Sequence, residues 1–353
     1  MKKFLVICAA LVAGLSTINA QVSGCEEVAI RFAGNASVTF QRYRHIEMVG
    51  QFSVAEKIDD ETGDKSYRYV RFSQGNLQYR ASTKKWRFAE QQYDIIASGN
   101  ENISSAYTGW IDLFGWATSG WNGSGAIEYQ PYATSKTNTD YVPTGDKNLV
   151  AGFVHCDWAY HNFIINGGDA DGPDSTQWRL LTAPEWKYLF ESRCQDLGGA
   201  GHFYAYGNLM GVHGIYLLPD TWDWNNLDID KSTWTAAQKT TLSNIKDNWI
   251  DGNTQKTFAN NTINDAVVWS GLEKAGMVFL PVTGRRYGTT YDSKYDDEGD
   301  YYSSNRYTSK NDRTPVLIFS EGSLVTPDNG KSASRVSKYI GKAVRPVQVT
   351  VDF

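Results

Sequence analysis

The chain lacks several features that identify common classes of protein. It has no basic cluster and its formal net charge is −5, which argues against binding to nucleic acid or to an anionic membrane surface. Beyond the N-terminus there is no apolar run long enough to span a membrane. Gly-x-Ser-x-Gly, P-loop and His-Glu-x-x-His motifs are also absent. The most readily recognised hydrolase, nucleotide and metalloprotease sites are therefore not predicted.

The N-terminus has the pattern of a secretory signal peptide. Met1, Lys2 and Lys3 form a positive start, an apolar run follows over residues 4–15, and small residues lead up to Ala20. This run is shorter than the roughly 20 residues that a membrane-spanning helix needs. We expect residues 1–20 to be removed. The mature protein is then predicted to be secreted, or to lie at the outer surface or in the periplasm of a Gram-negative bacterium.

Cysteine is scarce, with four in the whole chain. Cys8 lies in the signal, so Cys25, Cys156 and Cys194 remain, an odd number for an oxidising compartment. Residues 22–25 loosely fit a lipobox, which makes a lipid anchor at Cys25 the alternative to cleavage after Ala20. Cys156 and Cys194 are predicted to form a structural disulfide. Unpaired buried thiols, and redox or metal chemistry, are the alternatives.

Aromatic residues are abundant, with 12 Trp, 21 Tyr and 15 Phe, and 41% of the chain is hydrophobic. This composition is ample for a packed core. Residues 21–50 alternate like strands and are predicted to form a short leader before one large domain, residues 51–353. Two strands are expected around an acidic loop at residues 59–64, and two more around Gly75-Asn76.

Three helices are predicted within residues 51–353. Thr182-Ala183-Pro184-Glu185 has the form of a capping box, and apolar residues follow it at helical spacing. Residues 235–250 and 264–274 have helical patterns too. A hairpin is expected over residues 202–218, and short strands fill the C-terminal third. Few helices among many short antiparallel strands indicate the α+β class.

Four segments resemble motifs of one bacterial group. Trp178 to Trp186 (WRLLTAPEW) resembles a W-R-L-P-T-x-x-E-W segment, and Phe279 to Arg286 (FLPVTGRR) resembles an L-P-x-x-G-x-R turn. Asp300 to Ser304 (DYYSS) is similar to G-x-Y-W-S-S, with Tyr302 in place of Trp, and Ala343 to Val347 (AVRPV) resembles the closing motif. Together, over residues 178–349, they resemble FISUMP-type and formylglycine-generating-enzyme-like domains of secreted proteins from gut anaerobes.

This resemblance implies a C-type-lectin-like fold. Such a fold has a small antiparallel sheet, chain termini that lie close together, about two main helices and long loop-rich insertions. The group includes adhesins, pilus-tip-like proteins and one enzyme branch, so the fold alone does not choose a function. The enzyme branch uses paired cysteines near its C-terminus. This chain has no cysteine beyond Cys194, so we expect no such catalysis.

Two acidic loops are candidates for calcium, a possible cofactor, because hard cations prefer oxygen ligands. The metal ligands predicted in the first are Asp169, Asp171 and Asp174. The second comprises Asp292, Asp296, Asp297, Glu298 and Asp300. Solvated loop charge is the alternative for both. The spacing of His155 and His161 fits no zinc site, and His202 and His213 add no recognisable motif.

The late loops around residues 287–314 are the predicted ligand surface. They mix Tyr with Ser, Asn and Arg, and such mixtures give rigid contact area together with adaptable hydrogen bonds. Packing of several of these tyrosines beneath the loops is the alternative. The predicted ligand-binding residues are Tyr287, Tyr291, Tyr295, Tyr301, Tyr302, Asn305, Arg306 and Tyr307.

Two functions follow from these patterns. The first is a secreted or surface-exposed, non-catalytic binding protein, an adhesin or lectin-like module with a glycan or protein ligand. The second is a structural component of a cell-surface or pilus assembly, in which the leader strand pairs with a neighbour. A hydrolase is the third and weakest reading, because carboxylates abound but no pair is distinguished.

Overall fold

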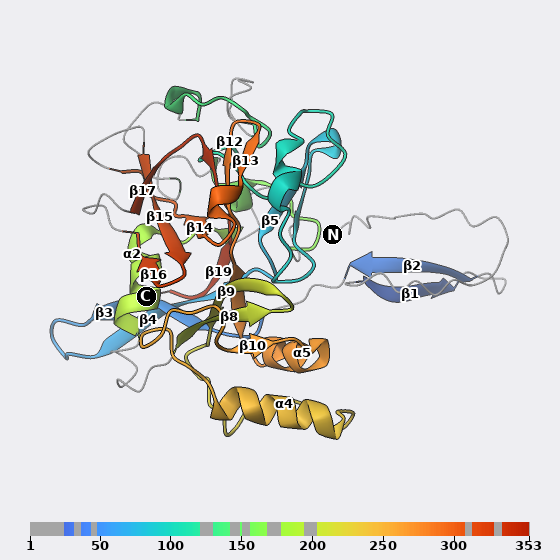
Figure 1. Cartoon of the computed structure of the whole chain (residues 1–353), viewed down its shortest axis with the longest axis vertical. Coiled ribbons are helices and arrows are strands. Elements are labelled where there is room, and N and C mark those ends of the chain that lie inside the picture. Colours follow the sequence, from blue (N-terminus) through green and yellow to red (C-terminus); the bar gives the residue numbers. More distant parts are fainter. Residues whose placement is uncertain are drawn as a thin grey trace. The chain divides into compact units, whose positions relative to one another are not determined.

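The computed structural model divides the chain into two units, residues 1–46 and 47–353 (Figure 1). The residues that it describes are 25–31, 37–43, 48–120, 130–141, 149, 156–167, 178–193, 203–307, 313–327 and 334–352. In the first unit, strands β1 (Cys25–Arg31) and β2 (Ser37–Tyr43) pair antiparallel. Both strands lie within the predicted leader.

Residues 48–50 belong to the second unit rather than to the leader. Met48 is 3% exposed within the core. Gly50 lies against the backbone of Gly276, and a Cβ at position 50 would lie 2.4 Å from the Gly276 carbonyl oxygen. The start of the second unit is therefore fixed by a backbone contact that only glycine permits.

A four-stranded antiparallel sheet joins the beginning and the end of the second unit. Its strand order is β3 (Phe52–Ile58), β4 (Lys65–Phe72), β19 (Val347–Val351) and β7 (Trp178–Arg179). Strands β3 and β4 flank the acidic loop at residues 59–64, as predicted. In the loop, the Asp59 carboxylate accepts the Glu61 and Thr62 amides at 2.9 Å, which stabilises the turn.

A second four-stranded sheet carries the predicted hairpin. Its order is β10 (Thr262–Ile263), β8 (Tyr204–Leu209), β9 (Val212–Leu217) and β11 (Val278–Pro281). The hairpin turns at Met210 and Gly211, both with positive φ. Strand β10 runs parallel to β8, whereas the other two pairings are antiparallel.

Smaller sheets make up the remainder. Strands β5 (Leu77–Arg80) and β6 (Lys85–Phe88) form one pair. A second sheet contains β12 (Arg285–Tyr287), β13 (Thr290–Asp292) and β18 (Ile340–Gly341). A third contains β14 (Gly299–Tyr302), β15 (Arg313–Ser320), β16 (Ser323–Val325) and β17 (Arg335–Ser337). Two strands flank Gly75-Asn76, as predicted, but β4 and β5 join different sheets and do not pair with each other.

Helix caps place the helices where the sequence predicts them. Helix α2 (Ala183–Lys187) begins with a complete Thr182–Glu185 capping box and continues as a wider π-helical turn over Tyr188–Ser192. Helices α4 (Ala236–Asp247) and α5 (Ala266–Lys274) begin after the caps Thr235 and Asp265. The described residues also contain a single turn, α1 (Trp158–His161), and the 3₁₀ turns Ala81–Thr83, Ala97–Glu101, Asn138–Tyr141 and Ser293–Tyr295.

The core is rich in buried aromatic rings. Trp186, Leu189 and Phe190 of the helical stripe are at most 3% exposed and pack with the first sheet. A second cluster surrounds Trp116 and Trp158. A third lies between the β8–β9 hairpin and helices α4 and α5, where α5 separates the hairpin from α4 (Figure 1). The fold is α+β, with small antiparallel sheets and few helices.

No helix in the described part of the chain is both long and apolar enough to cross a membrane.

Candidate functional site

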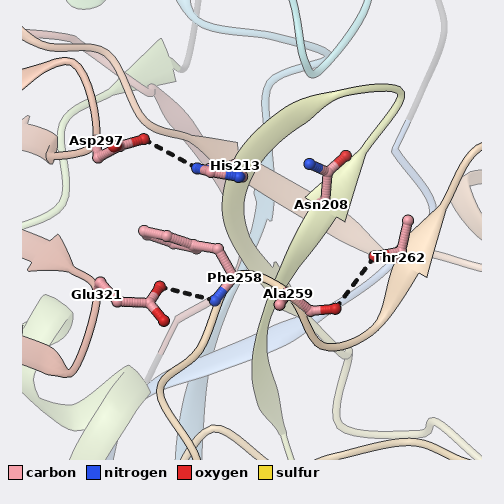
Figure 2. A pocket seen from close by; sticks show the side chains of 7 residues that line it. All are labelled: Asn208, His213, Phe258, Ala259, Thr262, Asp297 and Glu321. Carbon is pink, nitrogen blue, oxygen red and sulfur yellow. Dashed lines mark hydrogen bonds and ion pairs between the residues drawn. The ribbon is translucent and has the colours of Figure 1, made fainter.

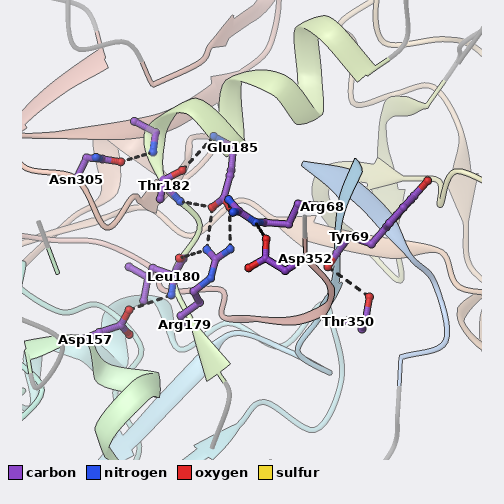
Figure 3. Close-up of polar contacts among 11 residues, drawn as sticks. Arg68, Tyr69, Asp157, Arg179, Leu180, Thr182, Glu185, Asn305, Thr350 and Asp352 are labelled. Carbon is purple, nitrogen blue, oxygen red and sulfur yellow. Dashed lines mark hydrogen bonds and ion pairs between the residues drawn. The ribbon is translucent and has the colours of Figure 1, made fainter. Parts of the chain in front are cut away.

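The segment Trp178 to Trp186 forms a polar network that holds the fold together (Figure 3). The Glu185 carboxylate accepts hydrogen bonds from Arg179 at 2.7 and 2.8 Å, and from Arg68 at 3.3 Å. It also accepts the Thr182 amide at 2.8 Å. Burial alone would raise the pKa of Glu185, but the Arg179 and Thr182 hydrogen bonds and the Arg179 charge outweigh it, and the pKa is lowered.

The same network reaches three other parts of the chain (Figure 3). Arg68 on β4 also contacts Asp352 at 2.7 Å. Asp157 accepts the Leu180 amide at 3.0 Å. Asn305 accepts the Ala183 amide at 2.6 Å, at the start of α2. These residues are committed to protein contacts and offer no open site.

Tyr301 and Tyr302 are core residues, so the prediction that they bind a ligand is wrong. They are 0% and 1% exposed. The Tyr301 hydroxyl donates to the Pro281 carbonyl at 2.7 Å, and the Tyr302 hydroxyl donates to the Ile340 carbonyl at 2.5 Å. Strand β14 is buried on both faces, and this directs both rings inward.

The next three predicted residues are also used within the protein. Asn305 caps α2. Arg306 and Tyr307 are 9% and 7% exposed, and the Arg335 guanidinium lies 3.9 Å from the Tyr307 ring centroid. The expectation that Arg306 and Tyr307 contact a ligand is therefore corrected as well, whereas Asn305 is partly exposed and its ligand contact stays a prediction.

Tyr287, Tyr291 and Tyr295 remain partly exposed. Tyr287 packs on Tyr339, with ring centroids 6.1 Å apart. The Arg285 guanidinium lies 3.8 Å from the Tyr295 ring centroid. These three are the only predicted ligand-binding residues with accessible ring surface, and they lie on β12, β13 and the following turn.

The predicted disulfide is not present, because Cys156 is a free, buried thiol. Burial, and then the neighbouring Asp157, raise the pKa of Cys156 to about 12, so the thiol stays protonated and unreactive. Its partner in the prediction, Cys194, lies outside the described residues.

The first calcium loop, with Asp169, Asp171 and Asp174, also lies outside the described residues. Within the described part of the chain no group of three metal-ligating side chains occurs. In the second acidic loop, Asp300 pairs with Arg285 and with the buried Lys342. The carboxylate of Asp300 is therefore already paired with two cationic side chains and is not free to bind a calcium ion.

A pocket of about 350 Å³ opens beside the β8–β9 hairpin (Figure 2). We call it the His213 pocket. It is lined by Asn208, His213, Phe258, Ala259, Thr262, Asp297 and Glu321. His213 Nδ1 lies 2.9 Å from an Asp297 oxygen, and the imidazole stacks on Phe258 with 4.9 Å between ring centroids and 9° between planes. The ring of His213 is thus held in one orientation.

Rigid elements position the other polar groups of this pocket. Asn208 lies near the end of β8, and its side-chain oxygen accepts the Gly211 amide at 2.8 Å, which leaves the amide NH₂ as a donor. One Glu321 oxygen accepts the Phe258 amide at 2.9 Å. Asp297 comes from the predicted late-loop region. That region reaches the pocket through an acidic side chain and not through its tyrosines.

The His213 pocket has the groups of a binding site but not those of a hydrolytic triad. A His–Asp pair activates a nucleophile only when a Ser, Thr or Cys lies within hydrogen-bond reach of the imidazole. The lining contains neither Ser nor Cys, and the Thr262 hydroxyl donates to the Ala259 carbonyl at 3.4 Å. Apart from Thr262, the polar side chains that line the pocket carry one imidazole, two carboxylates and an amide. The volume of the pocket is near the lower end of the range for ligand pockets, about 300–1,000 Å³.

Sequence reasoning missed this pocket. His213 and Asp297 were each visible, as a scattered histidine and as part of an acidic loop. Nothing in the sequence joins positions so far apart. The antiparallel pairing of β9 with β11 and the return of the chain through β13 bring them together.

Comparison of the chain with protein-family models, with curated proteins and with solved structures found no match.

Proposed function

We propose that this protein is a secreted or surface-exposed, non-catalytic binding protein whose His213 pocket binds a glycan. The observation that carries the proposal is the composition of that pocket. It combines an amide donor and an imidazole from the β8–β9 hairpin with two carboxylates from other loops, Asp297 and Glu321, and its lining contains no Ser or Cys. Such groups match the dense hydroxyls of a sugar, and each hydrogen bond can be tested separately.

The architecture supports a lectin-like scaffold. Strand β4 near the beginning of the second unit pairs with β19 at its end, and a short capped helix, α2, packs beside this sheet. Both features accord with the C-type-lectin-like fold that the four motifs imply. Export, with either cleavage after Ala20 or a lipid anchor at Cys25, belongs to the same proposal.

A glycan array with residues 21–353 tests the function. We expect binding to at least one glycan, and a loss of about threefold or more in His213→Gln and in Glu321→Gln, because one hydrogen bond contributes about 0.5–1.5 kcal/mol. Asp60→Asn, in the exposed β3–β4 loop, removes a charge far from the pocket and serves as the control. Unchanged binding in both pocket variants would reject the assignment.

A structural role is the second candidate, and the β1–β2 hairpin favours it. A two-stranded hairpin standing alone is marginally stable in water, so pairing with a strand of another protein would stabilise it. Removing residues 21–46 tests this role in cells. Surface display and assembly unchanged by the deletion would exclude it.

A further inference from the structure

A second pocket lies between helix α4 and the segment that precedes it. In Figure 1, α4 lies on the other side of α5 from the β8–β9 hairpin. The volume of the pocket is about 430 Å³. We call it the α4 pocket. The residues that matter for its chemistry are Trp224, Leu227, Leu242, Lys231, Lys239 and Lys246. One wall is helix α4 and the other is the segment that precedes it.

The wall formed by Trp224 is apolar and rigid. Its indole packs edge-on against Trp222, with ring centroids 5.1 Å apart, and against Trp249 at 5.0 Å. Leu227 and Leu242 extend this surface. Because the flanking rings fix Trp224, a ligand would bind its half-buried face without first having to order it.

Three lysines surround this apolar surface. Lys231 and Lys239 are exposed and Lys246 is half-buried. No carboxylate lines the pocket, and none of the three lysines forms an ion pair with a carboxylate in the described part of the chain. The three amines make the lining of this cavity positive. The exposed carboxylates of Asp223, Asp228, Asp230 and Asp247 lie in the same segments but not in the lining, and at physiological salt each charge acts over about 8 Å.

The spacing of the lysines selects an extended ligand. Lys239 and Lys246 are seven residues apart on α4 and so lie on one face of the helix, about 10 Å apart along its axis at 1.5 Å per residue. One small anion does not reach both, whereas a chain that carries anionic groups at intervals does. The indole face suits the apolar C–H face of a sugar ring.

We infer that the α4 pocket binds an acidic polysaccharide, with a sugar ring stacked on Trp224 and its carboxylate or sulfate groups paired with Lys239, Lys246 and Lys231. This site is separate from the His213 pocket. The variants that test the α4 pocket differ from those that test the His213 pocket, so the failure of one proposal does not affect the other.

Binding is measured by affinity electrophoresis and calorimetry on residues 21–353. The probes are polygalacturonate, chondroitin sulfate and uncharged dextran, with poly-aspartate as an acidic peptide. We expect at least one acidic polysaccharide to bind, dextran not to bind, and affinity to fall as salt is raised. Lys239→Gln combined with Lys246→Gln should weaken binding about tenfold.

Two further variants separate this site from general charge attraction. Lys57→Gln combined with Lys85→Gln makes the same change in net charge on exposed lysines elsewhere and should leave binding unchanged. Trp224→Phe keeps an aromatic ring and should weaken binding less than Trp224→Ala does, with the fold of each checked by circular dichroism. The inference is overturned if neither acidic polysaccharide binds, if the control pair weakens binding equally, or if poly-aspartate binds more tightly than both polysaccharides.

Discussion

Replacement of Glu185 by glutamine tests the buried polar network most directly. Glutamine keeps an oxygen for the Thr182 amide but removes the charge that pairs with Arg179 and Arg68. The Glu185 side chain is 3% exposed, that of Arg179 is 13% and that of Arg68 is 29%. Removing one partner of a fully buried ion pair costs about 3–5 kcal/mol.

The cost here should be smaller than that for a fully buried pair. Arg179 keeps a hydrogen bond to the Leu180 carbonyl at 2.9 Å, and Arg68 keeps Asp352. We therefore expect Glu185→Gln to lower the free energy of unfolding by about 2–3 kcal/mol at pH 7. Urea unfolding followed by tryptophan fluorescence measures this.

The pH dependence of this loss has a definite sign. The pKa of Glu185 is lowered by folding, so its stabilisation is fully present above the unfolded value, 4.5, and is lost as the pH falls through the folded pKa. The difference between wild type and Glu185→Gln should therefore shrink in acid.

Two control variants should both cost less than Glu185→Gln. Thr182→Ala removes only the helix cap and should cost about 1 kcal/mol. Glu90→Gln removes the exposed partner of Arg87 and should cost less than about 1 kcal/mol. A Glu185→Gln effect no larger than that of Glu90→Gln, or one that persists undiminished in acid, would refute the reasoning.

Three other predictions concern single positions. Tyr301→Phe removes the hydroxyl that bonds to Pro281 and should destabilise the fold by about 1–3 kcal/mol without changing glycan binding; weaker binding at equal stability would return Tyr301 to the ligand surface. Cys156 should resist alkylation in the native protein and be labelled in denaturant without reductant, as peptide mass spectrometry can show; labelling that requires reductant would restore the disulfide. Gly50→Ala should cost about 1–3 kcal/mol by crowding Gly276, and an unchanged urea midpoint would contradict the close backbone approach.

Local signals in the sequence predicted most of the helices and hairpins. The Thr182 box, the helical patterns of residues 235–250 and 264–274, and the strands on either side of residues 59–64 all depend on neighbouring residues, which a sequence displays directly. The two strands predicted around Gly75-Asn76 are present, but the sequence did not show that each pairs with a strand elsewhere. Strand pairing depends on residues far away in the chain, which local pattern does not contain.

The candidate site was less accessible to sequence reasoning for the same reason. The sequence around Tyr301 and Tyr302 is as rich in polar residues as that around Tyr287 and Tyr295. The structure separates the two pairs, because strand β14 is buried on both faces and β12 is not. The α4 pocket likewise needs the Trp222–Trp224–Trp249 packing, because lysines on a helix otherwise indicate only a solvated face. The burial of Tyr301 and Tyr302 and the packing of Trp224 both depend on contacts between distant parts of the chain, which only the complete fold shows.

The pairing of Phe72 with Val347 has a consequence for how the protein matures. The first sheet cannot be completed until β19 has left the ribosome, so one edge of β4 stays unpaired while the residues between the two strands are synthesised. Contacts of such long range slow folding. In the export that we propose, this delay would keep the polypeptide unfolded during translocation and postpone closure of the sheet until translocation is complete.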